Sequence, residues 1–116
     1  FGINGTYSPC ADFDLLLKAK ASADKLGISV HAGNLVSCDV FYEQQEDWWQ
    51  KWAKMGVLAV EMEAAALYMN AAFLGAKALC IVTISDHFIT SEHSTAAERE
   101  KSFTEMMQIA LEAAIA

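Results

Sequence analysis

Four stretches of the chain carry apolar side chains in patterns that predict helices, and shorter apolar runs separate them. Apolar residues recur at intervals of three and four over 12–26 and again from position 95 onward, which is the spacing of an amphipathic helix. Residues 46–55 hold three tryptophans, and residues 63–74 are rich in alanine. Glycines follow the first three stretches, at positions 27, 56 and 75, where they favour a helix end. The last stretch opens with a capping box of the form T-x-x-E, Thr95 to Glu98.

The runs between these stretches predict strands. Residues 28–37 hold the apolar Ile28, Val30, Leu35 and Val36 around Gly33, which indicates a strand with a kink or bulge. Residues 57–60 form a short apolar strand. Residues 78–85, ALCIVTIS, are apolar on both faces, as a central strand of a parallel sheet must be. A loop is expected over 39–45 and a second over 86–94.

The predicted order is therefore α-β-α-β-α-β-α, within one structural unit that spans residues 1–116. Such alternation is typical of the α/β class, with a mainly parallel sheet flanked by helices. Ligands of open parallel sheets bind beyond the carboxyl ends of the strands. That rule directs attention to the residues that follow the three predicted strands.

Composition narrows the range of functions. Fifteen acidic against eight basic residues give a net charge of −7, which disfavours nucleic-acid and membrane-surface partners. No apolar run reaches the 18 residues of a membrane span. The three cysteines and three histidines lack metal-site spacing, so we expect buried, reduced thiols and no metal. The chain also lacks a dinucleotide or nucleoside-triphosphate motif, so no cofactor is expected.

Two carboxylates follow the short strand at 57–60. Glu61 and Glu63 flank Met62, and a spacing of two places both on one side if the strand continues. Ionised carboxylates only accept hydrogen bonds, which suits the two donor hydroxyls of a ribose. Met62 could pack on the sugar ring. The alternative is that Glu63 only favours the first helical turn through the helix dipole and that Glu61 lies in solvent.

The strand at 78–85 ends in a second chemically useful pair. Ser85 can donate or accept a hydrogen bond, and Asp86 could act as a general acid toward a leaving group. Arg99 lies thirteen residues further on and could fold back to Asp86. The alternatives are a solvated turn for Asp86 and an ordinary exposed helix position for Arg99. His87 and His93 share the intervening loop and are expected to be mostly solvated.

The assembled motifs resemble one family, the hexameric, bacterial-type purine nucleoside phosphorylases. The resemblance rests on VEMEAAALY (60–68), SDHFITSEHSTAAER (85–99) and the tail FTEMMQIALEAA. The runs GNLVSCDVFY (33–42) and ADFDLL (11–16) match in order and spacing. The narrowest marker is the strand that ends in SDH and is followed by TAAER. The likeness covers nearly the whole chain but only the C-terminal half of a family member.

The resemblance implies a role for eight residues. Asp86 would donate a proton to purine N7 while the glycosidic bond breaks, and Arg99 would orient Asp86 or couple to its charge. Glu63 would be the main contact to the ribose hydroxyls, with Glu61 beside it. The other implied contacts to the base and sugar are Phe41, Val60, Met62 and Ser85.

The resemblance also implies what the chain does not carry. The phosphate-binding residues of the family lie N-terminal to all of the matched motifs, and Arg99 is the only arginine in the sequence, whereas a phosphate site prefers several. We therefore expect part of a cytoplasmic, homohexameric enzyme that uses phosphate as co-substrate, with the N-terminal half of the domain absent. The alternatives are a nucleosidase that uses water and a non-catalytic module that binds nucleosides or a partner.

Overall fold

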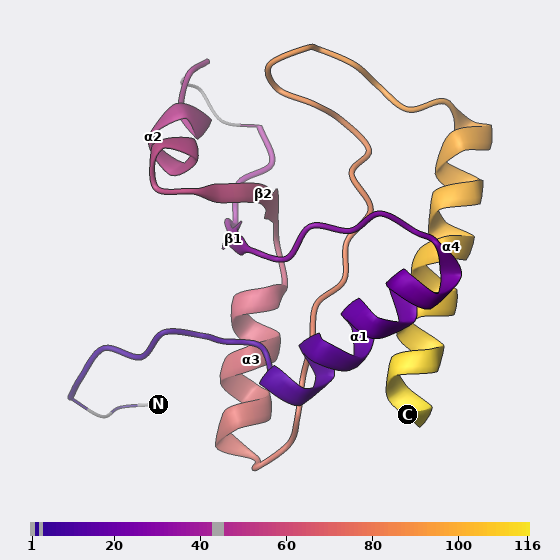
Figure 1. Ribbon diagram of the computed structural model, residues 1–116. Helices are drawn as coiled ribbons and strands as arrows, with labels where there is room; N and C mark the ends of the chain where they lie inside the picture. The colour runs from indigo at the N-terminus through magenta and orange to yellow at the C-terminus, as the bar shows by residue number, and fades with distance from the viewer. Residues whose placement is uncertain (1, 3, 43–45) are drawn as a thin grey trace.

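The computed structural model describes residues 2, 4–42 and 46–116, and the elements follow the order shown in Figure 1. In the described residues these elements are α1 (Phe13–Leu26), β1 (Asn34–Ser37), α2 (Trp49–Lys54), β2 (Val57–Glu61), α3 (Ala64–Phe73) and α4 (Ala96–Ile115). No helix in the described part of the chain combines the length and the apolar character that a membrane span requires.

The predicted helix ends of α1 and α4 are confirmed. The Asp12 side chain accepts a hydrogen bond from the Leu15 amide at 3.0 Å and caps α1. Gly27 ends this helix with a left-handed φ of 68°, a conformation that costs little without a Cβ atom. Thr95 and Glu98 form both hydrogen bonds of the capping box at the start of α4. Local sequence chemistry therefore determines where these two helices begin or end.

Strands β1 and β2 form a parallel pair joined through α2. Ser37 lies opposite Glu61 at the carboxyl end of the pair, and a register irregularity lies between Asn34 and Leu35. This irregularity beside Gly33 confirms the predicted bulge. A Cβ atom on Gly33 would approach Leu58 Cδ1 to 2.5 Å, so this position has no room for a side chain. The parallel β-α-β unit is the α/β alternation expected from the sequence.

The strand expected over 28–37 is shorter than predicted. Only Asn34–Ser37 pairs with a neighbour. Ile28 and Val30 instead pack against the small core between α1 and α4. These two apolar side chains therefore contact the helices α1 and α4, and they are not part of a sheet.

The strand expected over 78–85 is not formed in the described structure. This segment is extended and runs between α3 and α4 (Figure 1), but its backbone groups bond to isolated partners. The Ala78 carbonyl accepts from the Asp12 amide, and the Cys80 amide donates to the Tyr68 hydroxyl. Because a strand needs a continuous backbone ladder beside it, the apolar pattern alone does not make this segment a strand.

The helix expected over 46–55 begins later, at Trp49, and none of its residues is buried. Residues 46–48 form a turn before it. Positions 43–45 of the expected 39–45 loop lie outside the described residues. The three cysteines are free as expected, but Cys10 is exposed and the other two are only half-buried, so the expectation of buried thiols is wrong.

The core is small for a chain of this size. Its buried members are alanines and one isoleucine on α1 and α4, Ala19, Ala23, Ile109 and Ala113. The accessible surface is 8966 Å², whereas about 6,200 Å² is typical of a folded monomer of this mass. Many large apolar side chains are exposed, including Phe73, Leu74 and Leu111. The described fold therefore leaves a large apolar area uncovered.

Candidate active site

Glu61 lies at the carboxyl end of β2, where its carboxylate caps α3. One oxygen, Oε1, accepts a hydrogen bond from the Ser37 hydroxyl. The other, Oε2, accepts from the amides of Glu63 at 2.6 Å and Ala64 at 2.5 Å. These amides belong to the first turn of α3, whose N–H groups have no partner within the helix. Glu61 therefore joins β1, β2 and α3 at one point.

The pKa of Glu61 reflects this position. Partial burial raises the pKa of the carboxyl, but the hydrogen bonds from Ser37, Ala64 and Glu63 outweigh burial, and the net pKa is lower than usual. Glu61 is thus held in its ionised form by donors of the protein itself.

Glu63 is placed differently, although it lies only two residues further on. Its side chain is exposed, and Oε2 accepts a hydrogen bond of 3.2 Å from the Met62 amide. Met62 is also exposed, and Val60 is half-buried in β2. The Glu63 carboxylate is therefore open to a ligand, whereas that of Glu61 already accepts three hydrogen bonds.

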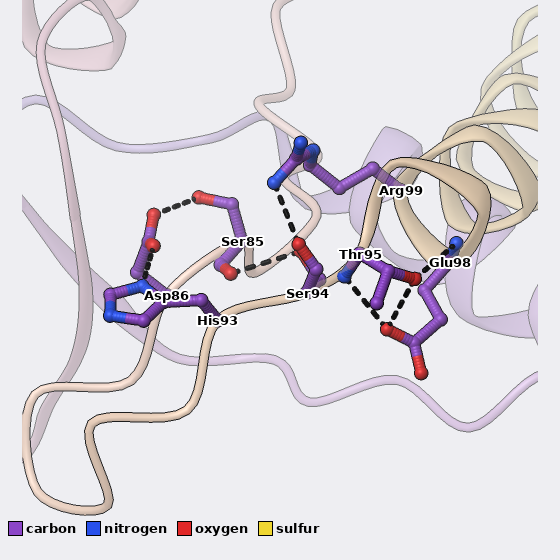
Figure 2. A network of polar contacts seen from close by, with 7 residues as sticks. All are labelled: Ser85, Asp86, His93, Ser94, Thr95, Glu98 and Arg99. Carbon is purple, nitrogen blue, oxygen red and sulfur yellow. Dashed lines mark hydrogen bonds and ion pairs between the residues drawn. The ribbon is translucent and has the colours of Figure 1, made fainter.

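Ser85 and Asp86 follow the extended segment 78–85 and start the loop before α4 (Figure 2). The Ser85 hydroxyl donates to Oδ2 of Asp86 at 2.6 Å. Oδ1 of the same carboxylate lies 2.5 Å from Nδ1 of His93. The backbones of Asp86 and His93 also form an antiparallel bridge. Each carboxylate oxygen of Asp86 is thus held by a different side chain.

These contacts lower the pKa of Asp86. The largest cause is the hydrogen bond from Ser85, followed by that from His93, while slight burial raises the pKa and the charges of His93 and Arg99 lower it further. Asp86 is therefore an ionised, exposed carboxylate in this conformation.

Arg99 does not contact Asp86 directly. Its Nη1 donates to the Ser94 carbonyl at 2.7 Å, as Figure 2 shows. The Ser94 amide and hydroxyl in turn donate to the Ser85 carbonyl, at 2.9 and 3.0 Å. Arg99 is thus connected to the start of the loop through Ser94, and its charge acts on Asp86 without an ion pair.

The tip of the 86–94 loop packs on α2. The Phe88 ring stacks on Trp49 with centroids 6.2 Å apart, and it meets Trp48 edge-on at 5.8 Å. Within the loop the His87 amide donates to the Glu92 carbonyl at 3.0 Å. These two tryptophans therefore support the loop that carries Asp86.

The charges of Glu61 and Glu63 act on Cys80, which lies in the segment that leads to Asp86. Burial is the main cause that raises the pKa of the Cys80 thiol, and the negative charges of Glu61 and Glu63 raise it further.

Phe41 lies in the bend after β1, is 74% exposed, and makes an edge-to-face contact with Tyr42 at 4.9 Å. Its ring is therefore free to stack on a heterocycle.

His93 is the residue that sequence reasoning undervalued. Nothing in its local sequence distinguishes it from His87, since both lie in a polar loop. Its contact with Asp86 depends on the loop closing so that position 93 faces position 86.

In the described residues no group of three potential metal ligands occurs.

Comparison with known proteins gives the family. Residues 4–116 match the sequence profile of a protein family described as "Phosphorylase superfamily". The chain belongs to the phosphorylase superfamily. The α/β class and the parallel β1–β2 pair agree with this membership.

Several curated members of the superfamily are similar to this chain, all called "Purine nucleoside phosphorylase DeoD-type". That of Latilactobacillus sakei subsp. sakei (strain 23K) is 53% identical over 116 residues, which are 100% of this chain and 49% of the relative. Those of Geobacillus sp. (strain WCH70) and Clostridium perfringens (strain SM101 / Type A) are each 50% identical over 109 residues, 94% of this chain and 46% of the relative. The chain thus spans about half the length of the curated relatives it matches.

Proposed function

We propose that the protein containing this chain catalyses phosphorolysis of purine ribonucleosides and 2′-deoxyribonucleosides, with free purine base and pentose 1-phosphate as products. The observation that carries the proposal is the 53% identity, over every residue of the chain, to a relative named as a purine nucleoside phosphorylase. The open carboxylate of Glu63 and the strand-terminal carboxylate of Asp86 support the same chemistry.

In this proposal Asp86 is the general acid. A purine leaves more readily as its N7 is protonated, so Asp86 must carry a proton when the glycosidic bond breaks. The unliganded carboxylate is ionised and exposed. A bound purine would shield it from water, and such desolvation raises the pKa of a carboxyl. Arg99 would stabilise the carboxylate that remains after the proton has left.

The sugar and base contacts come from β2 and the bend after β1. The exposed Glu63 would accept hydrogen bonds from the ribose hydroxyls, and Met62 and Val60 would line the pocket. Glu61 would act beside Glu63 while it caps α3. Phe41 would stack on the purine, with Ser85 facing the base.

We further propose that residues 1–116 form the C-terminal portion of one phosphorylase domain. Phosphate, the co-substrate, would bind to residues outside this chain, because Arg99 is its only arginine and it is hydrogen-bonded to Ser94. The uncovered apolar area supports burial against further protein. We propose that the complete protein is a cytoplasmic homohexamer.

The test is a product assay on the complete protein. Purified enzyme is incubated with a purine nucleoside, with and without inorganic phosphate, and the pentose product is identified. We expect free purine and pentose 1-phosphate in the presence of phosphate and no turnover without it. Free pentose formed without phosphate would contradict the proposal and favour a nucleosidase. Binding without turnover in either condition would favour a non-catalytic module.

A further inference from the structure

His93 contacts Asp86, and none of the sequence motifs predicts this contact. We propose that His93 is a positioning residue for the general acid: it fixes the Asp86 carboxylate in one orientation and stabilises its ionised form. This inference rests on the proposed function, because it assigns a partner to the residue that would protonate the purine.

The geometry of the loop supports a fixed orientation. Ser85 donates to Oδ2 at 2.6 Å and Nδ1 of His93 lies 2.5 Å from Oδ1, so rotation of the carboxylate breaks at least one contact. The backbone bridge between Asp86 and His93 holds the two side chains at the same level of the loop. The Ser94 amide and Ser85 carbonyl close the loop one residue further on, at 2.9 Å.

The contact with Asp86 indicates which ring nitrogen of His93 carries a proton. An ionised carboxylate can only accept a hydrogen bond, so Nδ1 must carry the proton that it donates to Asp86. The His93 side chain is 73% exposed, and Asp86 is its polar partner among the residues that the structure describes. Its protonated form would bind the Asp86 carboxylate more strongly than its neutral form does.

The other charged or titratable side chains described around the Asp86–His93 contact bond to different partners. The guanidinium of Arg99 lies on the α4 side and bonds to the Ser94 carbonyl. Within the loop, Nδ1 of His87 accepts from the amides of Ile89 and Thr90, at 3.2 and 3.3 Å. The Glu92 carboxylate accepts from the Thr90 hydroxyl at 3.0 Å. Both His87 and Glu92 are therefore engaged within the loop.

The proton step can be written with these residues. Protonated Asp86 gives its proton to purine N7 as the bond between the purine and C1′ of the sugar breaks. The bonding electrons leave with the base, and an oxygen of the co-substrate phosphate forms the new bond to C1′. The carboxylate that results again accepts from Ser85 and His93. Stabilising this ionised product makes Asp86 a stronger acid, and it also lowers the pH above which Asp86 has lost its proton.

The first test is a pH profile of kcat for the complete enzyme at saturating purine nucleoside, because kcat reports protonation in the enzyme–substrate complex. His93→Leu removes the donor, and we expect the alkaline limb to move to higher pH, because a hydrogen bond that favours the ionised carboxylate has been lost. We also expect kcat to fall more than KM changes. His93→Asn retains a donor near the Nδ1 position and should restore most of kcat. His87→Asn removes the neighbouring histidine but keeps an acceptor for the loop amides, so it should leave the profile unchanged.

The second test does not depend on activity. The tautomer of His93 is determined at alkaline pH from the imidazole nitrogen NMR shifts of the unliganded complete protein and of its Asp86→Ala variant. We expect Nδ1 to carry the proton in the wild type and to carry it less often in the variant, because the carboxylate that accepts its hydrogen bond has been removed. An unchanged tautomer together with an unmoved alkaline limb would overturn the inference. A tautomer that depends on Asp86 in a protein without phosphorolytic activity would uphold the contact and refute the proposed function instead.

Discussion

The ring of Phe88 lies nearly parallel to the indole of Trp49, at an interplanar angle of 9°. The two residues are 39 positions apart in the sequence, and they connect the loop that carries Asp86 to α2. Trp48 adds an edge contact to the same ring.

The Phe88–Trp49 contact should be measurable as a coupling free energy. We expect Phe88→Leu and Trp49→Leu to be non-additive in the free energy of unfolding, with a coupling of about 0.5–1.5 kcal/mol. Denaturant unfolding of the complete protein and its three variants gives this value. Ile89→Ala, at a neighbouring position that is 72% exposed, should show no coupling to Trp49→Leu. Additive effects of the first pair would mean that the stacking does not stabilise the loop.

Glu61 and Glu63 should respond differently to the same substitution. We expect Glu61→Gln to lower the free energy of unfolding by about 1–3 kcal/mol, because it removes the charge that accepts hydrogen bonds from Ser37 and the first amides of α3. Glu63→Gln should leave stability nearly unchanged and weaken nucleoside binding. Denaturant unfolding and nucleoside titration of both variants check this. The reverse pattern would show that the roles of the two glutamates are exchanged.

Glu61 should also contribute to the acid sensitivity of the fold. Its pKa is lower in the folded state than usual, so its ionised form stabilises the fold at pH values above the unfolded pKa of about 4.3. That contribution is lost as the pH falls through the lower folded pKa. We therefore expect the stability difference between wild type and Glu61→Gln to be full near neutral pH and to shrink in acid. A difference that stays constant down to the acid range would rule out this ionised cap.

Asp86 and Arg99 should behave as one unit in catalysis. In the complete enzyme we expect Asp86→Ala to reduce kcat by about 10²–10⁴-fold, with a much smaller effect on nucleoside binding. Arg99→Ala should cause a smaller loss, since it removes a charge that acts on Asp86 without touching it. The double variant should lose little more than Asp86→Ala alone. Steady-state kinetics test this, and near-normal turnover of Asp86→Ala with a base that leaves poorly would exclude Asp86 as the acid.

The 116-residue chain by itself should be inactive and should associate. It exposes 8966 Å², well above the area of about 6,200 Å² typical of its mass. Among the residues that the structure describes, no strand pairs with the 78–85 segment. We expect sedimentation to show assemblies and the product assay to show no pentose 1-phosphate. Phosphate-dependent turnover by a monomeric 116-residue chain would contradict this prediction.

Local features of the chain could be predicted because they depend on neighbours in sequence. The cap at Asp12, the left-handed Gly27 and the capping box of Thr95 and Glu98 each need only a few adjacent residues. The bulge beside Gly33 was predictable because a glycine interrupts an apolar run. The structure of residues 78–85 could not be predicted in this way. An apolar run indicates burial, but a strand also needs a neighbouring strand to pair with, which the run itself does not provide.

The sequence by itself determined the ends of α1, the start of α4, the α/β alternation around β1 and β2, and the presence of carboxylates after two of the predicted strands. Only the tertiary structure decided what each carboxylate does. Glu61 caps α3 because β1 brings Ser37 opposite it, and Glu63 stays open although it lies two residues away. Asp86 meets His93, and Phe88 meets Trp49, because the loop closes on itself and on α2. Such contacts depend on the distance between segments remote in sequence, and that distance is set by packing rather than by local spacing.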